Sequence, residues 1–260
     1  MKNFKYEGTA LVTGASSGLG EEFSRQLAAK GMDLVLVARS APKLQELAKE
    51  LEQEHSIHVH TISADLSREN AAKEVKRQTD SAGLQISLLV NNAGVGTYGR
   101  MGELDAEKEH NMIMLNCVAP VDLTHEYLSS MMKKGSGGLI FLGSVAAYQP
   151  TPYFASYGAS KAFNLLLGEA LWAELKGQGI SVLSLSPGYT RTKFQETADV
   201  HLNPPGGFMN ADEVVALALR KLGKKPSVIP GWRNRFMAFS IRFTPRAMAA
   251  RLAGRISKPG

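Results

Sequence analysis

The stretch Thr13-Gly14-Ala15-Ser16-Ser17-Gly18-Leu19-Gly20 decides the fold of this chain of 260 residues. It follows an apolar segment, residues 9–12, and precedes a helical pattern over residues 21–30. A strand, a glycine turn and a helix in this order are typical of a dinucleotide-binding unit, because the glycines let backbone approach a pyrophosphate and the helix N-terminus attracts its charge. The glycines are spaced three and then one residue apart, unlike the standard fingerprint, so these residues alone leave a plain strand-to-helix turn open.

The rest of the chain repeats this alternation of apolar and amphipathic segments. Residues 34–38 form a short apolar run, and residues 42–54 carry leucines at 44, 47 and 51, as expected for a helix with one buried face. Such alternation favours an α/β fold with a parallel sheet covered on both faces. The length suits one well-packed domain.

A second motif, Tyr157-Gly-Ala-Ser-Lys161, places a phenol and an ammonium four residues apart. In a helix both groups lie on one face and can reach the same small volume. The pKa of a free tyrosine is about 10, and a nearby cation lowers it. The pair is therefore interpreted as a general acid/base adjusted toward neutral pH, although such a pair also arises by chance in many helices.

Further motifs stand between and beyond these two in a definite order. Asn91-Asn92-Ala93-Gly94 follows a strand-like run over residues 86–90. The others are Asn116, Ser144 after residues 139–142, and Pro187-Gly188 after residues 182–185. With the glycine turn and the Tyr157 pair, they resemble the short-chain dehydrogenase/reductase family over residues 8–231.

The resemblance implies a Rossmann fold, a doubly wound parallel sheet of about seven strands, as a single domain over residues 1–231. It implies that Tyr157 exchanges a proton with a carbonyl or alcohol oxygen while a nicotinamide cofactor exchanges hydride with the carbon. Lys161 is then expected to lower the pKa of Tyr157 and hold the nicotinamide ribose. Ser144 would stabilise the substrate oxygen, and Asn116 would anchor a water beside the lysine.

Cofactor preference is predicted from the end of the second strand, Val37-Ala38-Arg39-Ser40. An acid there would hold the ribose hydroxyls of NAD, whereas a cation favours the 2′-phosphate of NADP. Ala38 takes the place of that acid and Arg39 follows, so NADP(H) is expected rather than NAD(H). By the same resemblance, Asp65 and Leu66 flank the adenine. The expected cofactor residues are Gly14, Ser16, Ser17, Gly18, Leu19, Gly20, Arg39, Ser40, Asp65, Leu66, Asn92, Ala93, Gly94, Tyr157, Lys161, Pro187, Gly188, Thr190 and Thr192.

Substrate recognition is expected in the segments between these motifs, residues 95–104, 148–154 and 189–209. The last contains Pro204-Pro205-Gly206-Gly207, which excludes regular helix or central strand. Four aromatic side chains either line an apolar pocket or serve packing: Tyr153, Phe154, Phe194 and Phe208. A ketone or aldehyde of apolar or lipid-like character, such as a 3-oxoacyl or steroid-like compound, is the expected substrate.

The C-terminal part of the chain has an unusual charge. Residues 214–260 carry eleven Lys or Arg and no acid, while residues 1–213 carry 19 basic and 24 acidic residues. From Trp232 onward, aromatic residues repeat at helical spacing among arginines, and a short helix is expected after Pro245. Residues 232–260 are therefore predicted to form a basic amphipathic extension. It could pack on the body or on another subunit, with its arginines paired to acids, or lie on an anionic membrane.

Several classes of protein are disfavoured by composition. A single cysteine, Cys117, excludes an intramolecular disulfide and fits a cytoplasmic protein, peripheral to a membrane if the extension binds one. No signal peptide is expected, since the first strand is predicted to begin within about nine residues, and no metal site or nucleic-acid partner is expected. The resemblance to the family also implies a homodimer or homotetramer that pairs through helices at residues 106–133 and 154–176.

An NADP(H)-dependent oxidoreductase is the function that these observations favour. An NAD-linked alcohol dehydrogenase working oxidatively is the nearest alternative. A sensor or scaffold that binds the cofactor without turnover is a third, but the chain keeps both Tyr157 and Lys161.

Overall fold

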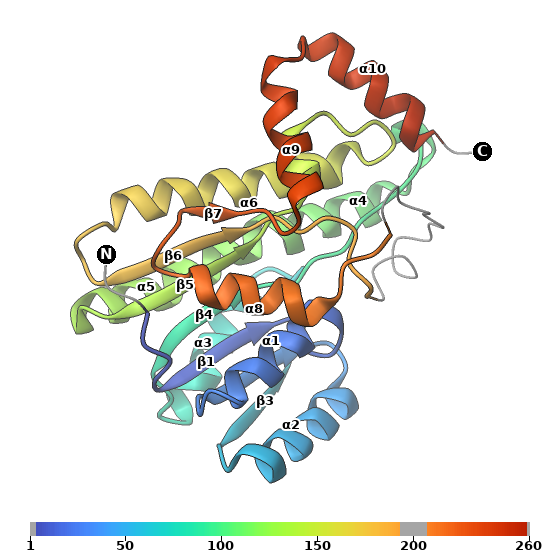
Figure 1. Ribbon diagram of the computed structural model, residues 1–260. Coiled ribbons are helices and arrows are strands. Elements are labelled where there is room, and N and C mark those ends of the chain that lie inside the picture. The colour runs from blue at the N-terminus through green and yellow to red at the C-terminus, as the bar shows by residue number, and fades with distance from the viewer. Residues whose placement is uncertain (1–3, 193–206, 259–260) are drawn as a thin grey trace.

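A seven-stranded parallel sheet forms the centre of the computed structural model, which describes residues 4–192 and 207–258 (Figure 1). The strand order is β3-β2-β1-β4-β5-β6-β7. The strands are β1 (Thr9–Thr13), β2 (Asp33–Ala38), β3 (Val59–Ser63), β4 (Ile86–Asn91), β5 (Gly137–Leu142), β6 (Ile180–Leu185) and β7 (Ser227–Val228). The predicted α/β fold with a doubly wound parallel sheet is confirmed.

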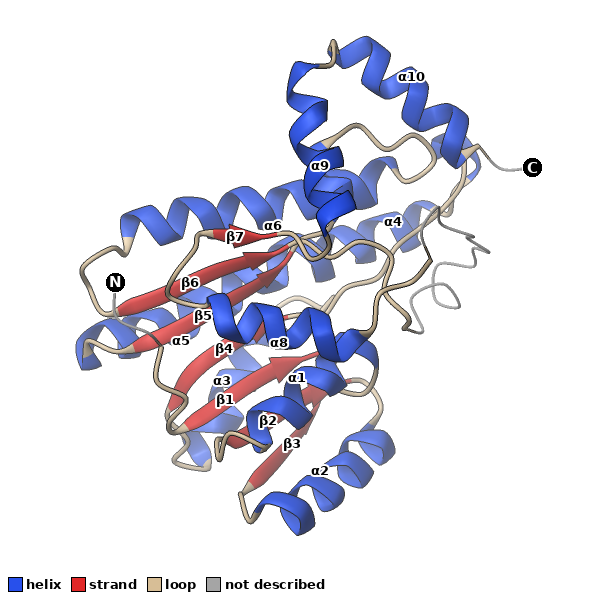
Figure 2. Cartoon of the chain, viewed as in Figure 1, coloured by secondary structure: helices blue, strands red, loops and turns tan. Residues whose placement is uncertain are grey.

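Helices cover both faces of this sheet (Figure 2). On one face lie α1 (Gly18–Ala28), α2 (Ala41–His55) and α8 (Ala211–Lys221), and on the other α3 (Ala71–Ser81), α5 (Ala119–Lys134) and α6 (Ala155–Glu174). Successive residues of a strand point to opposite faces, so β1 sends Ala10 and Val12 into the first core and Leu11 into the second. This double burial explains why the strands are almost uniformly apolar.

The helix expected over residues 106–133 is interrupted. It consists of α4 (Ala106–Ile113), a π-helical turn η2 (Met114–Val118) and α5. Asn116 lies in that turn and is completely buried. Its backbone carbonyl accepts a hydrogen bond of 2.7 Å from Asn164 Nδ2 on α6. Turns of this kind are frequent at functional sites, and this one fixes α6 against the segment that precedes α5.

The order of the strands creates a crevice where the direction of winding changes. Strand β1 pairs with β2 on one side and with β4 on the other, so the loops after β1 and β4 diverge from neighbouring strand ends. Thr13 joins these two loops: its hydroxyl donates to Val90 O at 3.2 Å and accepts from the N–H groups of Asn92 and Ala93 at 3.0 and 2.9 Å. The glycine turn and the Asn-Asn-Ala-Gly segment therefore form one connected structure.

The C-terminal residues form an elbow that stands out from the body on the side of the strands' carboxyl ends (Figure 1). It contains α9 (Trp232–Ser240), a 3-10 turn η4 (Ile241–Phe243) and α10 (Arg246–Ser257), with Pro245 at the bend. The predicted helix after Pro245 is thus present. Short 3-10 turns η1 (Met101–Glu103) and η3 (Val145–Tyr148) complete the assigned elements. No helix in the described ranges is both long and apolar enough to span a bilayer.

Candidate active site

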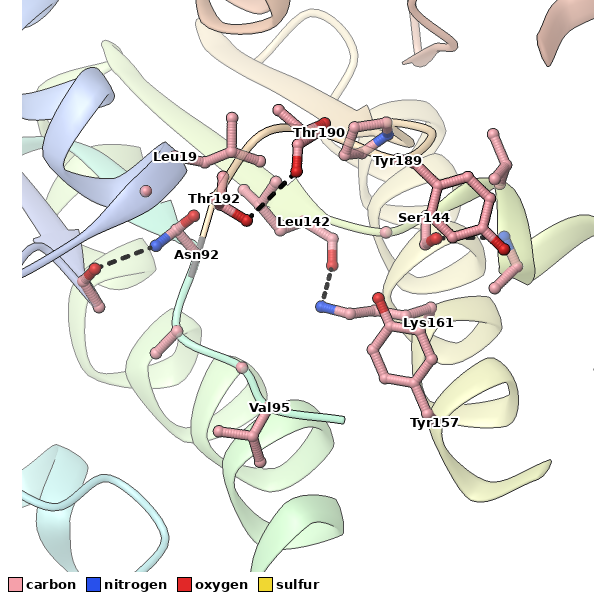
Figure 3. A pocket seen from close by; sticks show the side chains of 18 of the residues that line it. Leu19, Asn92, Val95, Leu142, Ser144, Tyr157, Lys161, Tyr189, Thr190 and Thr192 are labelled. Atoms are coloured by element: carbon pink, nitrogen blue, oxygen red, sulfur yellow. Dashed lines mark hydrogen bonds between the residues drawn. The ribbon is translucent and has the colours of Figure 1, made fainter. Parts of the chain in front are cut away.

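A cavity of about 810 Å³ lies at the carboxyl ends of the strands. Its wall combines the glycine turn, the segment after β4, the end of β5, the start of α6, the segment after β6 and the C-terminal elbow. Figure 3 shows Tyr157, Lys161 and Ser144 on one side of this cavity and Leu19, Asn92 and Thr192 on the other. The volume and position suit a dinucleotide together with a small organic substrate.

The glycine turn has no room for additional side chains. Gly14 and Gly18 have φ of 66° and 58°, a backbone conformation that glycine adopts without strain. A Cβ on Gly20 would stand 2.2 Å from the carbonyl oxygen of Gly14. Gly20, predicted to contact the cofactor, instead lies behind the turn and does not line the cavity. Its role in this structure is to let α1 begin directly against the turn.

The Asn92 side chain fastens the opposite edge of this turn. Its Nδ2 donates to the backbone oxygen of Thr13 at 2.8 Å. A Cβ on Gly14 would meet Ala93 Cα and Asn92 Nδ2 at 2.9 Å each. The two backbone segments that form the floor of the cavity are thus packed directly on one another.

Lys161 is held by the end of β5. Its Nζ donates to the backbone oxygen of Leu142 at 3.0 Å, and the side chain is only 6% exposed (Figure 3). Burial lowers the pKa of this amine to about 8, because a charged ammonium loses hydration inside the protein. Its fixed position follows from α6, which places Lys161 one turn after Tyr157 on the same helix face.

The hydroxyl of Tyr157 has a different environment from the one expected. Burial raises the pKa of Tyr157 to about 12, while a hydrogen bond with the Ser144 side chain acts in the opposite direction. Lys161 Nζ lies 5.8 Å from the centre of the Tyr157 ring and its hydrogen bond goes to Leu142. Burial is the largest cause and raises the pKa of Tyr157, so the lowered pKa predicted from the sequence is not found for the groups of the chain itself.

Ser144 stands at the end of β5, where it caps the turn η3. Its Oγ accepts a hydrogen bond of 3.1 Å from the N–H of Ala146. It is also the hydrogen-bond partner of Tyr157 and lines the cavity. The structure thus brings together the serine, tyrosine and lysine that the sequence motifs singled out.

Asn116 lies behind these three residues and does not line the cavity. Its side chain is fully used: Oδ1 accepts from Val95 N at 3.0 Å, and Nδ2 donates to Val95 O and Ser160 Oγ at 2.9 and 3.0 Å. These bonds hold the segment after β4 against α6. The observed contacts are therefore structural ones to Val95 and Ser160.

Basic side chains gather at the other end of the cavity, beyond β2. Arg39, Ser40 and Lys43 line it there, and Asp65 and Leu66 follow from the end of β3. Burial acts to raise the pKa of Asp65, but hydrogen bonds from Ser67 and the charges of Arg39 and Arg68 lower it overall. The site at this end contains two cations and one carboxylate.

Most of the other predicted residues also line the cavity. Those placed on its wall are Gly14, Ser16, Ser17, Gly18, Leu19, Arg39, Ser40, Asp65, Leu66, Asn92, Ala93, Gly94, Ser144, Tyr157, Lys161, Pro187, Gly188, Thr190 and Thr192.

The aromatic residues expected near the substrate divide into three groups. Phe154 and Phe208 line the cavity, and Phe154 contacts the ring of Tyr98 at 4.7 Å between centroids. Tyr153 does not line it. Phe194 and residues 204–206 lie outside the described residues.

The sequence motifs missed part of the wall. The missed residues include Lys43, and the C-terminal elbow contributes Arg233, Asn234, Met237, Ala253, Ile256 and Ser257. Gln149 and Thr151 also line the cavity, in the segment 148–154 where substrate recognition is expected. The spacing of the elbow residues indicated that they share a helix face. Arg233 and Met237 are four residues apart on one helix, and Ala253, Ile256 and Ser257 lie on one face of the next. The prediction instead followed the aromatic residues of the same helices, which lie on the opposite face.

The comparisons with known proteins agree with this geometry. The short chain dehydrogenase family model matches residues 8–202. A 7beta-hydroxysteroid dehydrogenase of Collinsella aerofaciens is 32% identical over 240 residues, covering 89% of each chain. A very-long-chain 3-oxoacyl-CoA reductase of Neurospora crassa is 33% identical over 231 residues, covering 87% of this chain and 68% of the relative.

A solved structure extends the likeness to three dimensions. A short-chain dehydrogenase from Sphingobium yanoikuyae in complex with NADPH superposes with a TM-score of 0.81 at 33% identity, over 91% of this chain and 93% of that one. The chain belongs to the short-chain dehydrogenase family. It is accordingly an oxidoreductase of the kind that interconverts CH–OH and C=O groups.

Proposed function

We propose that this protein is an NADP(H)-dependent carbonyl reductase for apolar ketones or aldehydes, with Tyr157 as its general acid/base. The observation that carries the proposal is the meeting of Tyr157, Ser144 and Lys161 in one cavity with the glycine turn. The turn offers close backbone approach and a helix N-terminus, which suit a pyrophosphate. NADPH would supply the hydride when bound.

Residues of the chain itself would transfer the proton to the substrate oxygen. The Tyr157 hydroxyl, hydrogen-bonded to Ser144, donates to the substrate oxygen as negative charge develops there. Ser144 stabilises the same oxygen. Lys161, fixed by Leu142 O, presents an ammonium beside the phenol and favours the phenolate that remains after transfer. Asn116 positions Val95 and α6 around this group.

The preference for NADP(H) is supported by the cations beyond β2. Arg39 and Lys43 line the cavity there, and Ala38 stands where an acid would repel a 2′-phosphate. An arginine can donate two parallel hydrogen bonds to a phosphate, which makes it the better phosphate partner of the two cations. The NADPH complex of the relative from Sphingobium yanoikuyae agrees with this assignment.

The apolar character of the substrate is supported by the outer wall. Phe154, Phe208, Met237 and Ile256 line the cavity on the substrate side. The names of two of the relatives point the same way, since a steroid and a very-long-chain acyl group are both large and apolar. We infer a bulky, lipid-like ketone rather than a small polar one.

Replacing Tyr157 by Phe tests the chemistry directly. The variant keeps the ring but has no proton to give, so hydride transfer to a ketone accepted by the parent protein should fall by roughly 1000-fold or more. Its dissociation constant for NADPH should stay within about threefold, because the glycine turn is unchanged. Near-normal turnover by Tyr157→Phe would disprove the role of the tyrosine, whatever the identity of the ketone.

A further inference from the structure

The C-terminal elbow buries small side chains and exposes large apolar ones, the opposite of an ordinary amphipathic helix. Its helices bury small side chains against the body: Ala238, Ala249 and Ala253 are 4%, 3% and 7% exposed. Its large apolar side chains face outward, and Phe243 and Ile256 are 75% and 78% exposed. The remaining exposed large apolar residues of the elbow are Trp232, Phe236, Phe239, Met248 and Leu252. Contiguous exposed apolar side chains of this size mark a binding surface.

The same outward surface is strongly basic. Six exposed arginines stand among the apolar side chains: Arg233, Arg235, Arg242, Arg246, Arg251 and Arg255. None of the ion pairs formed within residues 4–192 and 207–258 involves them. Of the alternatives that the sequence left open, packing of the aromatic stripe on the body of the same chain with its arginines paired to acids is therefore not what the described residues show. The surface joins apolar anchors to unneutralised positive charge.

We propose that this outward surface of α9–α10 docks on an anionic lipid bilayer. Aromatic and aliphatic side chains enter the headgroup region, while surrounding arginines contact phosphate and carboxylate groups. Packing of this face on the same face of a second copy is a poorer arrangement, because it would set arginines against arginines with no acid in residues 214–260. The T-shaped packing of Phe239 on Phe243, at 5.3 Å between ring centroids, presents both rings as one wedge.

Docking would place the mouth of the catalytic cavity at the lipid surface. Ile256 belongs both to the outward surface and to the cavity wall, and Arg233 does the same on α9. We infer that an apolar ketone enters from the bilayer past these two residues, and this step rests on the proposed function. Binding to vesicles itself needs no turnover, so its measurement is independent of that function.

Vesicle co-sedimentation of the full chain tests the docking. The parent protein should bind mixed phosphatidylcholine–phosphatidylserine vesicles well and pure phosphatidylcholine vesicles weakly. The triple variant Arg235→Gln/Arg242→Gln/Arg251→Gln should lose roughly 100-fold or more of its partition coefficient for the mixed vesicles, at about tenfold or somewhat less per arginine. A second variant, Phe236→Ser/Phe239→Ser/Phe243→Ser, should lose a comparable amount.

A matched control removes the same charge elsewhere. Lys133→Gln/Lys134→Gln/Lys225→Gln replaces three exposed lysines outside the elbow, and its binding should stay close to that of the parent. The triple variants leave the cavity wall untouched, so unchanged NADPH binding verifies that they are folded.

Tryptophan fluorescence gives a second readout, because the chain has only Trp172 and Trp232. In Trp172→Phe the remaining indole is 68% exposed on the elbow and should be quenched by brominated lipids. In Trp232→Phe the remaining indole lies on α6 and should not be. The proposal is overturned if both indoles respond alike, or if the arginine variant binds mixed vesicles as the parent does. A phenylalanine-dependent dimer that binds no vesicles would also overturn it, in favour of a second copy.

Discussion

The two ends of the cavity are built in different ways. At the cofactor end, backbone lies directly on backbone: a Cβ at Gly20 would overlap the Gly14 carbonyl, and Asn92 is bonded to Thr13 O. At the substrate end, the wall is an added pair of helices that rests on alanines. The first arrangement permits almost no change of residue, and the second can change without altering the chemistry. Mutations matched between the two ends can test this contrast.

The largest difference is expected between two glycine-to-alanine substitutions. Gly20→Ala should destabilise the protein by about 3 kcal/mol or more and abolish NADPH binding, since backbone must move to admit the methyl group. In Gly254→Ala the new Cβ would meet only the Pro152 side chain, at 3.3 Å, and alanine favours the helix. Its free energy of unfolding should change by less than about 1 kcal/mol. Denaturant unfolding of both variants measures the contrast, and equal losses would contradict it.

Arg39→Ala examines the cofactor end alone. Losing charge-assisted hydrogen bonds to a 2′-phosphate should raise the dissociation constant of NADPH by about 10- to 100-fold while that of NADH stays nearly constant. Arg220→Ala, an exposed arginine on α8 away from this cavity, is the control. Isothermal titration with both nucleotides gives the answer. Equal weakening of the two would remove the argument for NADP preference.

Lys161→Met probes the buried amine through pH. The pKa of Lys161 is lowered by burial to about 8 from its ordinary 10.5, so between these values the unfolded chain holds a proton that the folded protein lacks. Stability conferred by this group therefore rises with pH across that window. Between about pH 8 and pH 10, the parent should gain about 2 kcal/mol of unfolding free energy relative to Lys161→Met.

Burial raises the pKa of Cys117 in both of these proteins and opposes the gain, while the charge of Lys161 lowers that pKa only in the parent. Lys258→Met, which removes an exposed lysine of the elbow, serves as the control. Unfolding curves without nucleotide measure the free energies of unfolding. If the difference in unfolding free energy between the parent and Lys161→Met is the same at every pH, the assignment is refuted.

The smallest effect is expected at the substrate end. Met237→Ala enlarges the cavity, and kcat/KM for long-chain ketones should fall by about tenfold relative to short-chain ones. The control, Phe239→Ala, lies on the outward side of the same helix and should keep the parent's selectivity for ketones dissolved without lipid. A panel graded by chain length reports both. Loss of NADPH affinity in Met237→Ala would show that the two ends are not separable.

The sequence predicted most of the cofactor end because its contacts depend on short segments. The glycine turn, Asn92 and the Tyr157–Lys161 pair each follow a recognisable strand or lie on one helix, so their order along the chain and the family resemblance located them. The π-helical turn around Asn116 was not predicted, because no residue type marks such a turn and α4, before it, is too short to define the phase of an apolar pattern. The roles proposed for the catalytic residues stay predictions until turnover is measured.

The elbow was harder to predict for a physical reason. An amphipathic pattern normally identifies the buried face by its large apolar residues. Here Ala249 and Ala253 are buried while Phe236 and Phe243 are exposed, so the pattern alone did not decide which face meets the body. The elbow also lies far along the sequence from the other cavity residues, so no local pattern indicated that it lines the cavity.

One hydrogen bond bears on the order in which the site is assembled. Tyr98 Oη donates to the carbonyl of Ser257 at 2.9 Å and joins residues 159 positions apart, of which Ser257 lines the cavity. During synthesis the glycine turn, β4 and α6 emerge long before α10 can make this contact. A nascent chain therefore acquires its nucleotide end first and its substrate wall last. Since this wall rests on few contacts, local opening there would widen the entrance while the sheet stays folded.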